Sequence, residues 1–425
     1  MHLFSLIISV LAILSFYKLS RLLFPPIYAI SIVTILVMQE VFIVQSTFVL
    51  PEVLIMLLLI EVIRNYLLKN NKIVILCLSL LCLVKEIGIV ICISLIIFHV
   101  INNLKNIRNV FWPFISLFPA LVYFGYQKYI LGWFFYPLHI DLINYSASSI
   151  VKNSNIILYF LFVDQGRWCI SGLSIILAIV YLYRNPNRGG RLIILLFSFS
   201  LFLYFLTNIQ VVIFGLISTL LIVYYKSVEQ QNMLKQFMQF SFSMFISILV
   251  FSSLNFVMLR YFLCLIPVLL IMLSISNSGI LLKKIVYQLI FIGIIACVSI
   301  YSLNYNFTKK SWHDDASINY SNAVKVHLDL IKFCEENHWQ DKLIYTHFLL
   351  QQNMSRPELK YLTNDVGFNK VQGTGDIQSY HEVVIFSNLE LEESKYNSIK
   401  NNPTYKLVKK VNHNMAWGEI YQAIN

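Results

Sequence analysis

Long apolar runs recur from residue 1 to about residue 303, and only short polar stretches separate them. A helix needs an apolar run of about 20 residues to cross the hydrocarbon core of a bilayer. Helices suit such runs because they satisfy every backbone N–H and C=O within the segment, which lipid cannot do. The pattern therefore predicts an α-helical polytopic membrane protein. About twelve passes are expected, at residues 2–17, 25–44, 51–67, 73–84, 87–101, 110–125, 168–183, 192–206, 209–225, 237–254, 262–278 and 285–303.

The pattern changes after residue 303, where no apolar run reaches spanning length. An amphipathic helix is predicted over residues 318–337, because Val324, Leu328, Ile331 and Cys334 recur at spacings of three and four. Short strands are expected at 342–346, 382–386, 404–411 and 417–422, and a further helix at 391–400. These elements predict a transmembrane domain over residues 1–303 and a small soluble α/β domain over residues 304–425.

Charge is scarce and unevenly distributed: 12% of the residues are charged, and the net charge is +11. The membrane part holds 19 Lys and Arg against 7 Asp and Glu, whereas the C-terminal part holds 13 against 14. We attribute the basic excess to insertion topology and expect no nucleic-acid partner. Fourteen basic residues fall on one side of the predicted topology and five on the other. The richer side should be cytoplasmic, which places the C-terminal domain and the long loop 126–167 outside.

An ionic pair, Lys85–Glu86, interrupts the apolar stretch "SLLCLVKEIGIVICIS". If residues 73–101 formed one helix, every later loop would change sides and the basic residues would divide 9 against 9. The charge rule therefore favours two short passes that meet at Lys85–Glu86 on the outer side. Helices of this length span only about 18 and 22 Å, so the pair is expected in a recess below the outer surface. An ionisable pair there indicates a functional site, and a structural ion pair at a helix corner is the alternative.

Other polar residues gather near the same predicted outer side. Arg260 and Tyr261 begin a late pass in "NFVMLRYFLCLIP". Arg260 either grips a phosphate, which suits a guanidinium, or snorkels to the lipid headgroups. Glu40 and Glu52 flank a short turn. For each of them the alternatives are a catalytic base, a cation ligand, and a carboxylate that only stabilises a helix end. The loop 126–167 is long enough to form a lid over a site, and its apolar part is expected to lie flat at the interface.

Four of these stretches resemble a known family. "VKEIGI" (Val84–Ile89) resembles the TKE-x-G stretch of the GT-C membrane glycosyltransferases, closest to the protein O-mannosyltransferase and aminoarabinose-transferase branch (glycosyltransferase family 39). "RYFLCLIP" (Arg260–Pro267) is similar to their RYLLPxxP stretch at the outer start of a late helix. "GWFFYPLH" (Gly132–His139) falls where they carry a second large outer loop, and "QSTFVLPEVLIMLLL" (Gln45–Leu59) resembles the opening of their fourth helix. The resemblance covers about residues 1–303.

The resemblance implies a polyprenyl-phosphate-linked sugar donor and a glycan, lipid or protein acceptor at the outer face of a bacterial inner (plasma) membrane. The acceptor hydroxyl would attack the anomeric carbon, and the phosphate would leave. Lys85 and Arg260 would stabilise that phosphate, and Tyr261 would add a hydrogen bond. Glu86 would hold Lys85 or, together with His139, a divalent cation.

The resemblance also bears on the start of the sequence. In this family a first helix leads to a large outer loop that carries the catalytic acid, whereas this sequence begins at what resembles the second helix. We expect a start codon set too late or a gene fragment. A separate polypeptide that supplies the first helix, or an inactive copy of the enzyme, would also account for the difference. Glu52 and Glu40 are then the weak remaining candidates for a catalytic base.

Two other functions share part of this pattern. A polysaccharide polymerase or ligase would use the same lipid-linked donor but transfer a whole glycan. A non-enzymatic transporter of lipid-linked sugars would carry internal repeats and helices broken at the bilayer midplane, and the sequence contains no convincing repeat. The outer polar residues and the appended α/β domain favour the transferase.

Overall fold

The computed structural model describes residues 2–48, 50–104, 110–134, 143–172, 232–255, 257–281, 285–309, 315–363, 366–373, 377 and 381–424. The chain divides into two compact units, Met1–Ser302 and Leu303–Asn425, close to the predicted boundary. The predicted passes at 192–206 and 209–225, most of the pass at 168–183, and His139 lie outside the described residues.

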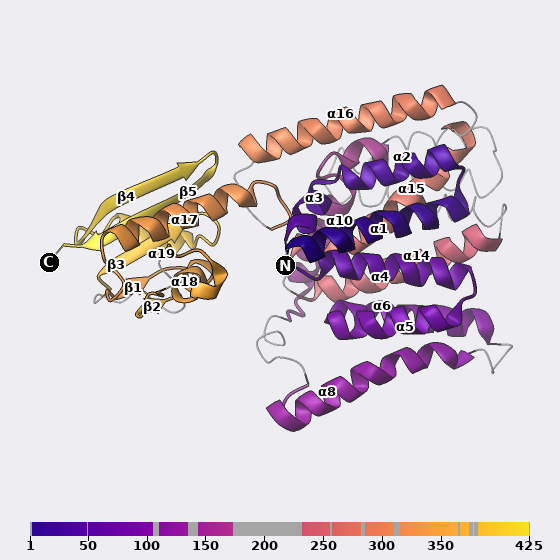
Figure 1. Cartoon of the computed structure of the whole chain (residues 1–425), viewed down its shortest axis with the longest axis horizontal. Coiled ribbons are helices and arrows are strands. Elements are labelled where there is room, and N and C mark those ends of the chain that lie inside the picture. The colour runs from indigo at the N-terminus through magenta and orange to yellow at the C-terminus, as the bar shows by residue number, and fades with distance from the viewer. Residues whose placement is uncertain are drawn as a thin grey trace. The chain divides into compact units, whose positions relative to one another are not determined.

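The first unit is a bundle of helices that run side by side (Figure 1). Contacts link α1 to α4, α4 to α5, α5 to α6, and α6 to α14. Tyr28 of α2 donates a hydrogen bond to the carbonyl oxygen of Ser274 in α15 (3.1 Å), which joins the start of the bundle to its end. The helices are α1 (His2–Leu23), α2 (Pro26–Val37), α3 (Glu40–Thr47), α4 (Glu52–Leu67), α5 (Asn71–Val84), α6 (Glu86–Asn103), η1 (Trp112–Leu117), α8 (Phe118–Leu131), α10 (Ala147–Phe162), α14 (Asn232–Ser253), η2 (Leu259–Cys264), α15 (Leu265–Leu281) and α16 (Ile285–Lys309).

Three helices of the described residues are long and apolar enough to cross a membrane: His2–Leu23, Glu86–Asn103 and Met233–Ser253. The pair α2–α3 would add a fourth span if it crosses as one unit. Many apolar side chains on the outside of the bundle are exposed, for example Leu3 (71%) and Leu121 (68%), as expected for helices whose solvent is lipid. These features support membrane association.

The predicted pass over residues 25–44 is wrong as a single helix, because α2 and α3 meet at a bend of 67°. Gln39 lies at the bend with an extended backbone (ψ 128°), so its peptide group does not continue the helix. The backbone N–H of Val41, at the start of α3, donates instead to Oε1 of Gln165 (3.0 Å). A remote side chain thus replaces a helical hydrogen bond, which lets the break persist inside the bundle.

Two other expectations also change. The apolar run over 110–125 begins as the 3₁₀ helix η1 and continues as α8, and a proline stands near the start of each; proline is well placed there because its N–H is missing. The apolar part of the loop 126–167 belongs to α10, which contacts α14 and η2. Ile157, Phe160 and Leu161 are buried in those contacts, so this segment packs into the bundle.

The break predicted at Lys85–Glu86 is present, and a glycine makes the corner tight. Helix α5 ends at Val84 and α6 begins at Glu86, with Lys85 extended between them (φ −166°, ψ 156°). Cβ of an alanine at Gly88 would lie 1.9 Å from the carbonyl oxygen of Leu81. Because backbone atoms occupy that space, only glycine lets α6 approach α5 so closely.

Gly88→Ala should therefore open the α5–α6 corner. Overpacking in a filled interior costs about 1–3 kcal/mol, and here the obstruction is backbone, so we expect the upper end of that range. Thermal unfolding of the purified full-length chain in detergent checks this. Gly125→Ala in α8 is the matched control, since a Cβ there meets nothing within 4 Å and should stabilise the helix slightly. Equal melting temperatures for the two variants would contradict the close approach.

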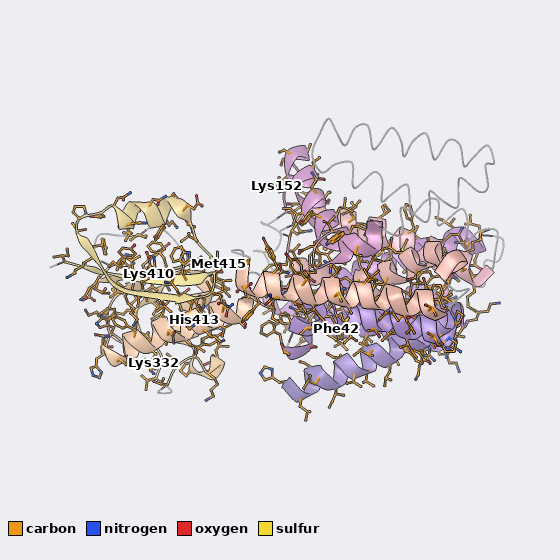
Figure 2. The ribbon with its side chains drawn as sticks, turned by 90° about the horizontal axis from the view of Figure 1, so that it is seen from above. Phe42, Lys152, Lys332, Lys410, His413 and Met415 are labelled. Atoms are coloured by element: carbon orange, nitrogen blue, oxygen red, sulfur yellow. The ribbon has the colours of Figure 1, made fainter. Side chains whose placement is uncertain are left out.

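The second unit is a five-stranded sheet with helices, in the strand order β2-β1-β3-β5-β4. Strand β1 is parallel to β2 and β3, whereas β5 is antiparallel to β3 and β4. Lys410 of β4 pairs with Glu419 of β5 (2.8 Å), and His413 pairs with Asp329 of α17 (2.7 Å). Figure 2 labels Lys410 and His413. The elements are α17 (Tyr320–Glu336), β1 (Ile344–Tyr345), α18 (Phe348–Ser355), η3 (Pro357–Leu359), β2 (Val371–Gln372), β3 (Val383–Ser387), α19 (Glu393–Lys400), β4 (Tyr405–His413) and β5 (Ala416–Ala423).

The predicted strands and both predicted helices of this unit are confirmed, but the buried face of α17 is rotated from the predicted one. Ile331 and Cys334 are buried as expected, whereas Leu328 is 38% exposed. The buried face instead includes Val326, His327 and Leu330. It packs on β5 at Gly418, where an added Cβ would lie 2.6 Å from Leu330 Cδ1.

Two buried histidines make this unit acid-sensitive. Burial, and secondarily the neighbouring imidazole of His347, lowers the pKa of His327 to about 4. Burial likewise lowers the pKa of His347 to about 4, against the opposing effect of Glu392 and with the help of Lys395. His327 Nε2 lies 3.1 Å from Ser387 Oγ, and its Nδ1 lies 3.3 Å from the side-chain nitrogen of Asn353. Protonation of the neutral ring at Nδ1 would place a second N–H opposite the N–H of the Asn353 amide, donor against donor.

Because both pKa values lie below the usual value of about 6.5, the unfolded state binds more protons than the folded state between pH 6.5 and 4. The contribution of the two histidines to the free energy of unfolding is therefore fully present above pH 6.5. It is lost as the pH falls towards 4, by on the order of 3 kcal/mol per histidine. Hydrogen exchange of the full-length chain, followed in peptides from α17 and β3, should accelerate over this range. His327→Gln should weaken that pH dependence, and an unchanged profile in this variant would contradict the role of His327.

Candidate functional site

Four of the side chains selected from the sequence meet at one end of the bundle. Glu52 is the first residue of α4, and Lys85 links α5 to α6. Arg260 and Tyr261 lie in η2, just before α15. Helix α4 contacts both α5 and η2, so segments up to about 200 residues apart in the sequence supply one cluster. We call these four residues, Glu52, Lys85, Arg260 and Tyr261, the Glu52 cluster.

The two cations of the Glu52 cluster share one carboxylate oxygen. Lys85 Nζ lies 2.9 Å from Glu52 Oε1, and Arg260 Nε lies 3.3 Å from the same atom. Lys85 Nζ also stands 3.4 Å from the centre of the Tyr261 ring, and the Arg260 guanidinium carbon is 5.4 Å from it. Tyr261 thus contributes a ring face to the cations, which favours positive charge there.

Burial explains why these charges stay together. The Glu52 side chain is 2% exposed, whereas Lys85 and Arg260 remain 20% and 17% exposed. A carboxylate removed from water needs charged or hydrogen-bonding partners, and the position at the start of α4 adds a favourable helix dipole. Glu52 is therefore the inner anchor, and it holds two cations whose outer parts are accessible.

The charges of the Glu52 cluster favour an anion. One carboxylate against an ammonium and a guanidinium leaves a net charge of +1 within these four residues. Lys85 and Arg260 would both repel a divalent cation placed beside them. Among the described residues no group of three or more His, Cys, Asp and Glu side chains could hold a metal.

The expected pairing of Lys85 with Glu86 is wrong. Lys85 pairs with Glu52 of another helix rather than with its neighbour Glu86, because the extended backbone at Lys85 turns it towards the start of α4. The proposed cation site of Glu86 and His139 is not tested, since His139 lies outside the described residues.

Glu40 belongs to a second buried network beside the bend of α2–α3. Arg167 is 3% exposed and donates to Oε1 of Gln39 (2.8 Å) and from Nε to the carbonyl oxygen of Phe160 (2.9 Å). Gln165 accepts from Arg167 Nη1 at 3.2 Å. Asp164 and, to a smaller extent, Glu40 (1% exposed) attract Arg167 electrostatically.

Sequence patterns did not single out Gln39, Gln165 or Arg167 as members of one network. A signal was present in the sequence: polar side chains next to an apolar run, and an arginine preceded by a glycine in "DQGRW" (Asp164–Trp168). Gln165 and Gly166 both adopt positive φ (53° and 80°), so this tight turn aims Arg167 back into the bundle. The network holds the break of α2–α3 in place.

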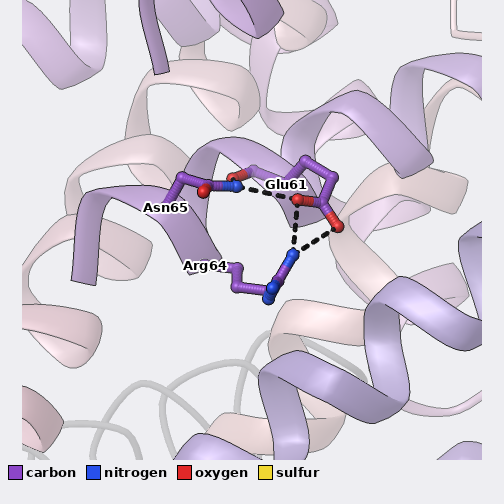
Figure 3. A network of polar contacts seen from close by, with 3 residues as sticks. All are labelled: Glu61, Arg64 and Asn65. Atoms are coloured by element: carbon purple, nitrogen blue, oxygen red, sulfur yellow. Dashed lines mark hydrogen bonds and ion pairs between the residues drawn. The ribbon is translucent and has the colours of Figure 1, made fainter. Parts of the chain in front are cut away.

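A third charged group, Glu61, Arg64 and Asn65, lies in the last turns of α4 (Figure 3). Arg64 donates to both oxygens of Glu61 (3.1 and 2.9 Å), and Asn65 donates to Glu61 Oε2 (2.7 Å). All three residues lie within one helix, and the ion pair is partly exposed. Such a pair contributes at most about 1 kcal/mol, so this group is a structural one.

The chain matches no protein-family model, no curated protein and no solved structure. Its function is therefore inferred from the chemistry of the Glu52 cluster and from the motifs that its residues occupy.

Proposed function

We propose that the chain is a membrane glycosyltransferase with a GT-C-like arrangement of about twelve passes, and that the Glu52 cluster holds the phosphate of a polyprenyl-phosphate-linked sugar. One observation carries the proposal: Lys85 and Arg260, from two motifs that resemble those of this family, share one buried carboxylate and leave a net positive charge. A phosphate that takes up negative charge as it leaves is stabilised by such a pair.

The proposed step is a substitution at the anomeric carbon of the sugar. An acceptor hydroxyl oxygen forms the new bond to that carbon, and the bond from the carbon to the phosphate oxygen breaks with its electron pair moving to the phosphate. Lys85 and Arg260 would donate hydrogen bonds to that phosphate, and Tyr261 would keep the Lys85 ammonium in position. The product phosphate carries one more negative charge than the bound diester, so the net positive site favours cleavage.

The proton of the acceptor hydroxyl must pass to a base. Within the described part of the chain, Glu52 Oε2 is a buried oxygen with no hydrogen-bond partner, whereas Oε1 is held by the two cations. Glu52 Oε2 is therefore the candidate for the base in this cluster. Glu40, the other candidate, lies in the Arg167 network instead.

The test uses the full-length chain in nanodiscs and polyprenyl-phosphate sugars labelled in the sugar, with mannose, glucose and aminoarabinose as a first panel. Release of polyprenyl phosphate is the readout, because slow transfer to water reports cleavage even when the natural acceptor is unknown. We expect release from at least one donor and its loss in Glu52→Ala. Failure of every donor, with the chain folded, would oppose the proposal.

A second candidate, transport of a lipid-linked sugar, is favoured by the 67° bend between α2 and α3. Transporters place broken helices at their substrate sites, and here buried Gln39 and Arg167 lie at the break. Movement of a fluorescent lipid-linked sugar across a vesicle membrane, without release of polyprenyl phosphate, would favour this function over the transferase.

A further inference from the structure

A cavity lies at the opposite end of the helices that carry the Glu52 cluster. Its volume is about 410 Å³, and it is lined from α4, the start of α5, α6, η1 and α14. Tyr66, near the end of α4, is 14 residues after Glu52, which corresponds to about 21 Å along a helix. The cavity is therefore separate from the Glu52 cluster, and nothing in the proposed transfer step uses it.

One wall of the cavity is aromatic. Tyr66 and Trp112 have ring centres 6.4 Å apart, and Trp112 meets the ring of His99 edge-on at 5.0 Å. Tyr66 and His99 are fixed by a hydrogen bond between the Tyr66 hydroxyl and His99 Nδ1 (3.0 Å). Phe98, which also lines the cavity, and Phe240 pack against the Tyr66 ring. The rings support one another, so this wall is a rigid surface.

The rest of the lining is polar but almost uncharged. Asn102, Asn103 and Gln236 contribute side-chain amides, each with two donors and an acceptor oxygen. Asn102 donates to the carbonyl oxygen of Phe98 and Asn103 to that of His99, both at 2.8 Å, which fixes the two amides on α6. Among the described lining residues Lys69 alone carries a formal charge, and there is no carboxylate.

This lining excludes several classes of ligand. Among the lining residues that the structure describes, a phosphate or a metal ion would find one exposed lysine and no acid. A purely apolar molecule would cover the amides without replacing their hydrogen bonds to water, which costs free energy. A flat base that stacks between two rings needs a parallel gap of about 7 Å, twice a contact distance of about 3.5 Å, whereas Tyr66 and Trp112 stand closer and are tilted by 34°.

We propose that this cavity binds a neutral sugar ring. Such a ring has an apolar C–H face for the Trp112–Tyr66 wall and hydroxyl groups around its edge for Asn102, Asn103 and Gln236. The volume is within the range for small-molecule sites, about 300–1,000 Å³, and such sites often lie between helices of a bundle. The same sugar chemistry is offered by a free glycoside and by the headgroup of a glycolipid.

The experiment uses the full-length chain in phosphatidylcholine nanodiscs free of sugar detergents. Saturation-transfer NMR measures binding of methyl glycosides of glucose, galactose, mannose and N-acetylglucosamine at millimolar concentration. Native mass spectrometry measures retention of a monoglucosyl diacylglycerol added to the same nanodiscs. Binding in the first arm alone identifies a free sugar as the ligand, and binding in the second identifies a headgroup; either result supports the proposal.

Variants separate this site from the Glu52 cluster. Gln236→Ala and Trp112→Ala should each weaken binding about tenfold, equivalent to roughly 1.4 kcal/mol, whereas Trp112→Phe should retain most of it. Asn304→Ala, at an exposed position of α16, should bind as the native chain does. The proposal is overturned if no glycoside or glycolipid binds, if Trp112→Ala binds equally well, or if adenosine competes better than the glycosides. A negative result here leaves the transferase proposal intact.

Discussion

Lys85→Gln is expected to lower the rate of donor cleavage by about 10²–10³-fold, the cost of removing one preorganised donor from a developing negative charge. The variant should still fold, because Glu52 keeps its contact with Arg260. Arg260→Gln should have a comparable effect and leaves Glu52 paired with Lys85. The kinetics of polyprenyl phosphate release from the full-length chain in nanodiscs measure both variants.

The controls for Lys85→Gln separate charge from geometry. Lys152→Gln removes a lysine at an exposed position of α10 and should leave the rate unchanged. Arg260→Lys keeps the positive charge but loses the planar guanidinium. Its rate of donor cleavage should therefore lie between those of Arg260→Gln and the native chain. A Lys85→Gln enzyme with native kcat and KM would exclude Lys85 from the step.

Arg167→Met should give the largest loss of stability in the bundle. The change leaves the carbonyl oxygen of Phe160 and the side chain of Gln39 without their buried donor, and it leaves Glu40 without the cation that attracts it. Removal of one partner from such a buried charged network costs about 3–5 kcal/mol. For a chain of this size that corresponds to a fall in melting temperature of roughly 10 °C, measured on the detergent-purified chain.

Arg64→Met is the matched control for Arg167→Met. It removes an arginine from the partly exposed pair with Glu61 and should cost less than about 1 kcal/mol. If both substitutions lowered the melting temperature equally, the Arg167 network would not hold the α2–α3 bend.

Local features of the bundle could be predicted from the sequence, and long-range pairing could not. The break at Lys85–Glu86 follows from the alternation of basic residues between loops. Glu86 was expected to hold either Lys85 or, with His139, a divalent cation, yet the carboxylate that Lys85 reaches is that of Glu52, 33 residues away. Sequence adjacency suggests a pair, whereas the extended backbone at Lys85 and the packing of α4 against α5 decide which carboxylate it reaches.

The bend of α2–α3 and the register of α17 show the same limit. The hydrogen bond that holds the bend connects Val41 to Gln165, 124 residues apart, so a local apolar pattern cannot contain it. On α17 the spacing of apolar residues does not predict that His327 is buried. This polar residue is buried because Ser387 and Asn353 satisfy the hydrogen bonds of its ring. Burial of a satisfied polar side chain rotates the packed face away from the one that apolar spacing predicts.

The cavity at the other ends of these helices could not be predicted from the sequence either. Tyr66, His99 and Trp112 lie in three different elements, and each is an ordinary residue in its own segment. Only their packing around one cavity reveals them as a candidate sugar site, so no motif could have indicated it.

The most direct test of the Glu52 cluster as a phosphate site is a comparison of two lipids that differ only in the phosphate. Native mass spectrometry of the full-length chain in nanodiscs would measure retention of a polyprenyl phosphate and of the matching polyprenol. We expect at least about tenfold stronger retention of the phosphate, a difference of roughly 1.4 kcal/mol, and loss of that preference in Lys85→Gln and in Arg260→Gln. Equal retention of the two lipids by the native chain, or an unchanged preference in both variants, would contradict the account.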